Sequence, residues 1–280
     1  MTTRHYSLIK GFALATLMPL FAACSSEDDA TVPGREQQEV QVSISTRVTA
    51  DGDEWIWQSG DVTGLQVTGY DNTTSSYTLS YTGSAWYGNR GISTILPGTI
   101  TVWYPGGDGT SATSFTIPVN QNTNEYLCKA DFMTYSGDLI STTPSVTLEH
   151  RLSKVIVTIT DWSDYGNAMP NVTDFKIQTL ESITVNGSTV TGDGNTIDIF
   201  PLQDEAAHSY TAIVAPNAGF NITLVVDGKD KTVTYSGTLE SGNAYSFNLT
   251  LKDTNAHDTR SADTSDYELE LVEVRDLNEE

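Results

Sequence analysis

Apolar and polar residues alternate along most of this chain, and this period of two is the pattern that most narrows what it can fold into. Val40, Val42 and Ile44 alternate with polar neighbours, and the same spacing returns at residues 77–81, 99–104 and 146–148. Alternation of this kind places apolar side chains on one face of a β-strand and polar side chains on the other. Helical spacing is nearly absent, so we expect an all-β fold.

Turn residues separate these segments at intervals of about ten residues. Short strands at this spacing predict antiparallel β-sandwiches, in which two stacked sheets each bury one face. The residue types that favour tight turns, mainly glycine, asparagine and aspartate, gather at residues 70–72, 104–108, 186–188, 191–195 and 227–230.

Two such sandwiches in tandem are expected, the first over residues 39–162 and the second over residues 171–252. Residues 151–160 read as a strong strand of the first sandwich, and the turn-rich stretch that follows predicts a linker or a long crossover. About seven short strands then make up the second sandwich. Residues 253–280 are expected to form a polar linker and a C-terminal strand or tail, in which the alternation slips by one residue after Leu271 and so predicts a bulge or bend.

Residues 1–23 have the features of a lipoprotein signal peptide. Two cations, Arg4 and Lys10, precede an apolar run that is too short to span a bilayer as a stable helix. Small residues then lead to Cys24, so we expect cleavage between Ala23 and Cys24 and acylation of the Cys24 thiol. Phe21 stands where leucine is usual. An ordinary secretory signal is the alternative, and it too sends the chain across the inner membrane.

An acidic tether follows over residues 24–38. Its cluster at residues 25–29 resembles the export signal that carries lipoproteins to the outer face of the outer membrane in some Gram-negative bacteria. We therefore expect a surface-exposed lipoprotein of the cell outer membrane, with a periplasmic lipoprotein as the alternative.

Charge and cysteine content exclude several classes of function. The chain carries 36 acidic and 14 basic residues, a formal charge of −22, which repels nucleic acid and anionic lipid headgroups. Acylation of Cys24 leaves Cys128 without a cysteine partner, so neither an intramolecular disulfide nor a cysteine zinc cluster is expected. We predict no nucleic-acid partner, no metal and no cofactor.

No residue pattern predicts catalysis. His150 stands at the head of an apolar strand between Glu149 and Arg151, without a nucleophile or an orienting partner at a recognisable spacing, and a structural role is expected for it. The aspartate-rich turns lack the spacing of a calcium loop. Hydrolase, phosphate-loop and metalloprotease motifs are absent from the sequence, so we predict that the protein is not an enzyme.

Five further segments stand in a recognisable order and spacing: residues 57–65, 115–121, 131–133, 146–155 and 239–249. Together they resemble the fimbrillin family of lipoproteins, the subunits of type V pili. The resemblance covers about residues 24–252 and implies sandwiches of the transthyretin type.

The resemblance implies assembly into a fimbrium with other pilin subunits, as a homopolymer or a heteropolymer. An Arg-specific, trypsin-like protease would cut after an arginine near the start of the chain, and loss of the first strand would expose a groove. A terminal strand of another subunit would then fill it, because an open sheet edge offers unpaired backbone groups above apolar pockets.

Two segments match these roles. A cut after Arg47 would release residues 24–47 with the lipid and the first strand, whereas a cut after Arg35, the rival position, would leave that strand in place. At the other end, Tyr267, Leu269 and Leu271 alternate with acidic residues. This tail is a candidate donor strand, or it closes its own domain.

The chain is short for a major stalk subunit, so a minor, tip or anchor role that supports adhesion to host or bacterial surfaces is expected. The alternative is a surface glycan-binding lipoprotein of a nutrient-uptake system, with Trp86, Tyr87 and Tyr104 as glycan contacts. Trp57 is expected to plug the end of a sandwich, with Gly60 and Asp61 forming the turn that follows.

Overall fold

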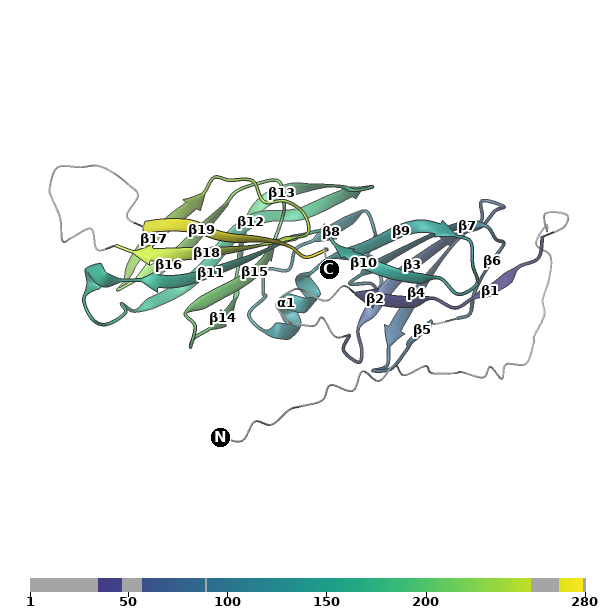
Figure 1. Ribbon diagram of the computed structural model, residues 1–280, viewed down its shortest axis with the longest axis horizontal. Helices are drawn as coiled ribbons and strands as arrows, with labels where there is room; N and C mark the ends of the chain where they lie inside the picture. Colours follow the sequence, from purple (N-terminus) through teal and green to yellow (C-terminus); the bar gives the residue numbers. More distant parts are fainter. Residues whose placement is uncertain (1–34, 47–56, 89, 253–266, 279–280) are drawn as a thin grey trace, which may run out of the picture.

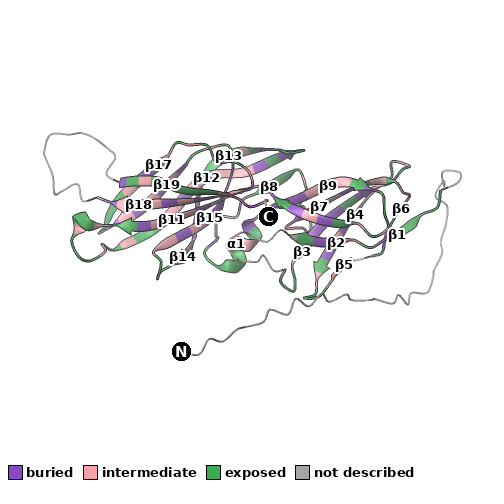
Figure 2. Ribbon diagram, viewed as in Figure 1, coloured by how far each residue is buried: buried purple, intermediate pink, exposed green. Residues whose placement is uncertain are grey.

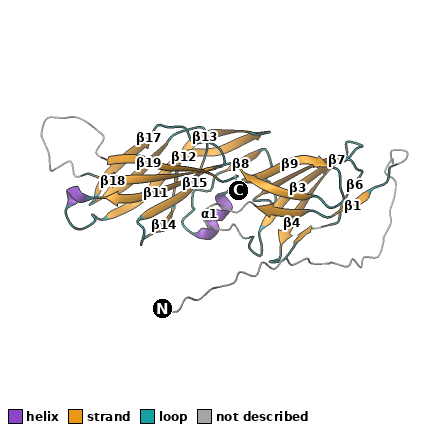
Figure 3. Ribbon diagram, viewed as in Figure 1, coloured by secondary structure: helices purple, strands orange, loops and turns teal. Residues whose placement is uncertain are grey.

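The computed structural model describes residues 35–46, 57–88, 90–252 and 267–278, and nearly all of their regular secondary structure is β-strand. Among them Figure 3 shows two short helical segments, α1 (Asn124–Ala130) and the 3-10 turn η1 (Ser163–Tyr165). The prediction of an all-β fold is confirmed. The strands fall into two groups that lie end to end (Figure 1), with α1 near the junction.

The first group is one seven-stranded sheet with a two-stranded ribbon beside it. In the sheet the strand order is β2-β10-β9-β7-β3-β4-β5, and the ribbon pairs β1 with β6. Both contribute to one core, to which the ribbon adds Val40 and Ile92. The strands are β1 (Gln38–Val40), β2 (Ser43–Thr46), β3 (Val62–Thr68), β4 (Thr74–Tyr81), β5 (Trp86–Gly88), β6 (Ile92–Thr94), β7 (Gly98–Tyr104), β9 (Met133–Leu139) and β10 (Ser145–His150).

The second group is a β-sandwich of two sheets. One has the strand order β14-β15-β11-β18-β19. The other has the order β13-β12-β16-β17, with β8 also paired to β12. Aromatic pairs cross its core: Phe220 contacts Phe247 with ring centroids 5.3 Å apart, and Phe175 stacks on Tyr210 at 3.7 Å. The strands are β8 (Ser114–Thr116), β11 (Ser153–Asp161), β12 (Val172–Asn186), β13 (Thr189–Ile199), β14 (Leu202–Asp204), β15 (Ser209–Val214), β16 (Phe220–Val226), β17 (Lys229–Tyr235), β18 (Asn243–Leu251) and β19 (Tyr267–Asp276).

Burial alternates along the central strands, as Figure 2 shows. In β11, Val155, Val157 and Ile159 are buried while the residues between them are not. This is the pattern of strands that bury one face against a second layer.

Strand β11 lies in a different part of the fold from the one we expected. It was predicted to belong to the first sandwich, but its partners are β15 and β18, and it is the central strand of its sheet. Periodicity shows that a strand has a buried face, but not which sheet receives it. The turn-rich residues 162–171 are therefore a crossover from β11 to β12, between the two sheets of the second group.

Three further expectations differ from the structure. Residues 40–45 are divided between β1 and β2, which pair with different strands. The short strands predicted around residues 175–177 and 183–185 are one long strand, β12. Residues 191–195 are part of β13 instead of a turn; the register shifts opposite Leu180 and Ser182, and Gly194 takes a φ of 86° there. Glycine in a strand supports such a bulge because it accepts positive φ.

Other turns lie where the sequence predicted them. Gly187, with φ 62°, joins β12 to β13, and Asp227 and Gly228, with φ 47° and 78°, join β16 to β17. Positive φ at both central residues suits the right-handed twist of a two-residue hairpin.

Residues of the first group enter the core of the second. Trp103 of β7 belongs to the same buried cluster as β11 and β18, as do Ala130 of α1 and Phe132 just before β9, and the Phe132 ring stacks on Phe115 of β8 at 4.9 Å. The fully buried Gln121 donates from Nε2 to the carbonyl of Ile213 at 2.9 Å and accepts its N–H at Oε1 at 2.7 Å. The two groups are therefore joined by a packed junction.

Candidate functional site

The first described residues form a strap across the first group of strands, and we call residues 35–46 the N-terminal segment. Two of its side chains are buried in the core of that group: Val40 is 3% exposed and Ile44 is 6% exposed. Val42 packs against the same core. The segment thus supplies apolar side chains that complete a core made by later strands.

Backbone hydrogen bonds hold the segment along the edge of the seven-stranded sheet. β2 runs parallel to β10, with Ile44 opposite Val146. Just before β2, Gln41 N–H donates to the Thr142 carbonyl at 2.8 Å and Ser43 N–H donates to the Pro144 carbonyl at 3.0 Å. Because β2 is the outermost strand, β10 is protected from solvent only by this segment on that side.

The two candidate cleavage positions bracket the segment. The guanidinium of Arg35 lies 3.7 Å from the centre of the Tyr70 ring and donates to the Leu96 carbonyl at 2.9 Å. Arg47 follows the last residue of β2, and it lies outside the described residues. The same holds for Ala23 and Cys24, the predicted signal cleavage and lipidation positions.

The candidate donor strand pairs with its own chain in this structure. β19 lies antiparallel to β18 at the edge of its sheet. Tyr267 is buried and Leu269 partly buried in the second core, whereas Leu271 is 39% exposed. The register shifts at Val272, between the pairs Phe247–Leu271 and Ser246–Glu273. The bulge predicted from the slipped alternation is confirmed.

The end of the chain is fastened to the junction. Leu277 is 3% exposed, and its N–H donates to the Gly242 carbonyl at 2.7 Å. Asn278 accepts the N–H of His150 at 2.8 Å and donates to its carbonyl at 3.3 Å. Residues after β19 thereby tie the second group of strands to the end of β10 in the first.

His150 also carries the main buried electrostatic contact of the junction. Its Nδ1 lies 2.7 Å from Oδ2 of Asp131, and both side chains are almost fully buried. Burial by itself lowers the pKa of His150, but the charge of Asp131 and the hydrogen bond with it together raise this pKa above its ordinary value of 6.5. The Nε2 atom is buried and has no hydrogen-bond partner among the described residues. The site holds a fixed imidazole whose geometry suits a structural role.

The three aromatic residues proposed as glycan contacts do not form a common surface. Tyr104 is 2% exposed and donates to Asp61, Trp86 packs at 4.9 Å from Trp57, and only Tyr87, at 49%, is well exposed. Trp86 and Tyr87 lie in the short strand β5. Trp57 packs against Trp86 and Tyr104 at the base of the core, in line with the predicted plug.

Other candidate chemistry is limited in the described part of the chain. No group of three or more His, Cys, Asp or Glu side chains there is arranged to hold a metal ion. Burial raises the pKa of the Cys128 thiol to about 11, so the thiolate form that reacts is scarce at neutral pH.

A search of the described residues for membrane-spanning helices finds none with the length and hydrophobicity needed to cross a bilayer.

Sequence reasoning missed the junction and one polar pocket. Nothing in the local pattern around Gln121 indicates that its amide binds a strand 92 positions away. Asp131 lies 19 positions before His150 and two residues before Met133, which pairs with His150 in the antiparallel β9–β10 ladder, so the contact could be found only once that pairing and its register were known. The pocket did leave a signal in the sequence. Thr94 in β6 and Ser75 in β4 are polar residues at positions where the alternation predicts a side chain that faces the core.

Known structures share this fold at low sequence identity. A candidate cell adhesion protein of Bacteroides ovatus has 16% identity and a TM-score of 0.60, over 88% of this chain and 100% of that one. A candidate cell adhesion protein of Bacteroides uniformis has 18% identity and a TM-score of 0.59, over 87% and 99%. The tip fimbrial protein Mfa3 of Porphyromonas gingivalis, with a C-terminal truncation, has 10% identity and a TM-score of 0.50, over 85% and 100%.

No curated protein sequence matches this chain. The sequence model of the fimbrillin-like family, however, matches residues 46–266. This span runs from the last residue of β2 to the residue before β19, so it covers most strands of both groups and the junction between them. The chain therefore belongs to the fimbrillin-like family.

Proposed function

We propose that this protein is a minor subunit of a surface pilus, of the tip or anchor type, and that it assembles by protease-triggered strand exchange to support adhesion. One observation carries the proposal: the N-terminal segment is an edge element whose side chains Val40 and Ile44 fill the core of later strands. Membership of the fimbrillin-like family supports the pilus role.

Loss of the N-terminal segment would leave a groove with unpaired backbone groups and an exposed apolar space. Along β10, backbone groups that now pair with β2 would lose their partners, and so would the carbonyls of Thr142 and Pro144. Beneath them, the space filled by Val40 and Ile44 would open to water. An incoming strand with apolar side chains at matching positions satisfies both demands, since it restores hydrogen bonds and apolar burial together.

Arg47 suits this role better than Arg35. Arg35 is held against Tyr70 and Leu96, so a protease would have to detach it first, and a cut there would leave β1 and β2 in place. A cut after Arg47 falls directly behind Thr46, the last residue of β2, and separates the whole segment from the rest.

The state of β19 favours a subunit that receives a strand. Donation of Tyr267, Leu269 and Leu271 to another subunit would require nine residue pairings with β18 to open, from Leu251–Tyr267 to Asn243–Asp276. A tip subunit accepts a strand without donating one, and an anchor subunit keeps its lipid. The structural likeness to the tip fimbrial protein Mfa3 accords with a tip role.

The remaining parts of the proposal concern export. We place the protein on the outer face of the outer membrane, tethered through a lipid on Cys24 before processing, with two transthyretin-like sandwiches beyond the tether. The glycan-uptake alternative has less support, because Trp86, Tyr87 and Tyr104 are not gathered on one exposed face.

The test is limited digestion of the purified lipoprotein with an Arg-specific protease, followed by N-terminal sequencing and gel filtration. We expect a new N-terminus at Val48 and an open groove that then binds an added synthetic peptide of residues 38–46, which co-elutes with the processed protein. Arg47→Lys should abolish both, whereas the matched variant Arg35→Lys should leave both unchanged. A product that starts at Val48 but binds no peptide would count against strand exchange, and cleavage at Arg35 alone would count against the processing site.

A further inference from the structure

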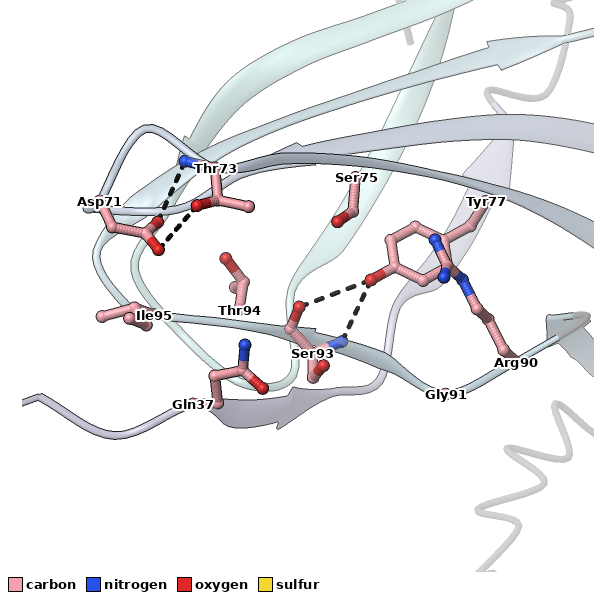
Figure 4. Close-up of a pocket in the computed structure, with 10 residues that line it drawn as sticks. All are labelled: Gln37, Asp71, Thr73, Ser75, Tyr77, Arg90, Gly91, Ser93, Thr94 and Ile95. Carbon is pink, nitrogen blue, oxygen red and sulfur yellow. Dashed lines mark hydrogen bonds between the residues drawn. The ribbon is translucent and has the colours of Figure 1, made fainter. Parts of the chain in front are cut away.

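A polar pocket opens between β4 and the β1–β6 ribbon, on the side of the first group away from the junction (Figure 4). Its volume is about 270 Å³, enough for a ligand the size of one sugar ring. Its lining residues are Gln37, Asp71, Thr73, Ser75, Tyr77, Arg90, Gly91, Ser93, Thr94 and Ile95.

The pocket replaces apolar core by hydroxyl groups. Along β4 the core-facing positions are Ser75, Tyr77 and Leu79, and along β6 they are Ile92 and Thr94. Tyr77, Leu79 and Ile92 belong to the first core, whereas Ser75 and Thr94 line the pocket. The inner faces of β4 and β6 therefore both change from apolar to polar residues where they line the pocket.

Thr94 presents an unpaired hydroxyl to the pocket. The residue is 7% exposed, and no hydrogen bond to its hydroxyl is found within the described residues, where the side chains of Ser75 and Gln37 also lack partners. The hydroxyl oxygen is not one of the fully buried unpaired atoms of these residues, so it is accessible to a ligand in the pocket. In Figure 4 the Thr94 hydroxyl lies between Asp71 and Ser75, inside the ring of labelled side chains.

Gly69 keeps this space open. A Cβ atom at Gly69 would lie 2.6 Å from the Thr94 hydroxyl oxygen and 2.9 Å from Oδ1 of Asp71. Both distances are too short for a side chain, so the absence of one leaves the hydroxyl and the carboxylate accessible from the pocket.

The charged groups balance at its two ends. Hydrogen bonds from the hydroxyl and N–H of Thr73 lower the pKa of Asp71, so it is a carboxylate at neutral pH. Arg90 lies across from it, with its guanidinium carbon 4.8 Å from the centre of the Tyr77 ring. One negative and one positive group favour a ligand without net charge.

From these features we infer that the pocket binds a single neutral sugar residue, such as an end unit of a surface glycan. Sugar hydroxyls both donate and accept, and so match a wall of threonine, serine and glutamine side chains with a carboxylate and a guanidinium at its ends. An apolar ligand is disfavoured because the wall offers little apolar surface.

The test is ligand-observed saturation-transfer NMR on the full chain with the methyl glycosides of glucose, galactose and mannose, and with N-acetylglucosamine and glycine. We expect at least one sugar to bind with a dissociation constant of about 1–10 mM. Thr94→Val, which keeps the shape and removes the hydroxyl, should weaken binding by about three- to tenfold. Gln37→Ala, at an exposed position where folding is not at risk, should weaken it by a similar factor.

Thr232→Val is the matched control, since Thr232 is an exposed residue of β17 far from the pocket, and it should leave binding unchanged. The inference is overturned if no sugar binds at about 50 mM. It is also overturned if the bound sugar ignores both Thr94→Val and Gln37→Ala, or if glycine alone binds, which would identify a site for zwitterions.

Discussion

The buried pair of His150 and Asp131 is the single contact most sensitive to pH. Because the pKa of His150 is raised in the folded chain, its protonated form is favoured by folding. This contribution is fully present below about pH 6.5 and is lost as the pH rises through the raised pKa. Lys154 and Asp276 also face the ring, with opposite effects, and Asp131 outweighs both.

Asp131→Asn should therefore reverse the pH trend of stability. Without the carboxylate, burial dominates and lowers the pKa of His150, so the variant should gain stability as the pH rises toward about 6.5, whereas the wild type loses stability as the pH rises above about 6.5. At about pH 5.5 the variant should be less stable by about 3 kcal/mol. Urea unfolding from about pH 5.5 to about pH 8.5 measures this.

Asp138→Asn makes the same change of charge at an exposed position of β9 and should keep the wild-type trend. Parallel curves for the wild type and Asp131→Asn would show that the pair does not set the protonation of His150.

At this scale the sequence indicated only part of the outcome. A structural role for His150 was predictable because no nucleophile stands at a usable spacing. Its partner was not, since Asp131 precedes β9 and is brought close only by the register of the β9–β10 ladder, in which Met133 pairs with His150. A contact of this kind depends on the tertiary fold and leaves no periodic trace.

Among the elements, β19 is held by its last residues as well as by its pairing. Leu277→Ala should free the end of the strand, because it truncates a buried side chain that is only 3% exposed. We expect the N–H of His150, which is bonded to Asn278, to exchange with solvent at least tenfold faster, a change of about 1.4 kcal/mol in local opening. Hydrogen exchange followed by NMR checks this.

Val272→Ala is the control, since Val272 is 57% exposed at the bulge of the same strand. It should change the exchange of His150 by less than about twofold. Equal effects of the two variants would mean that the end of the chain is not a fastening point.

Strand positions were predictable wherever alternation and turn chemistry agreed, as in β4, β7 and the β16–β17 hairpin. Partners were harder. β11 reads the same whether it closes the first sandwich or forms the centre of the second, because both choices bury Val155, Val157 and Ile159. Only the pairing with β15 and β18 decides between them.

At the scale of the whole molecule, the junction predicts that the two groups of strands unfold together. Trp103 of β7 and Phe132 just before β9 share a core with the second group, so neither group can open without exposing the other. Calorimetry of the wild type should show one transition. Gln121→Ala strips both backbone partners from Ile213 and should lower stability by about 1–3 kcal/mol and separate the transition into two.

Gln66→Ala, on the exposed face of β3, should preserve the single transition and the melting temperature. Two transitions in the wild type would show that the junction does not couple the groups.

The N-terminal segment contributes Gln37 to the sugar pocket as well as Val40 and Ile44 to the core. A sugar bound in the pocket must therefore stabilise the attachment of the segment. Because linkage is reciprocal, loss of the segment must weaken sugar binding by the same factor. Sugar affinity would then distinguish the unprocessed, membrane-tethered subunit from the processed subunit in a fibre.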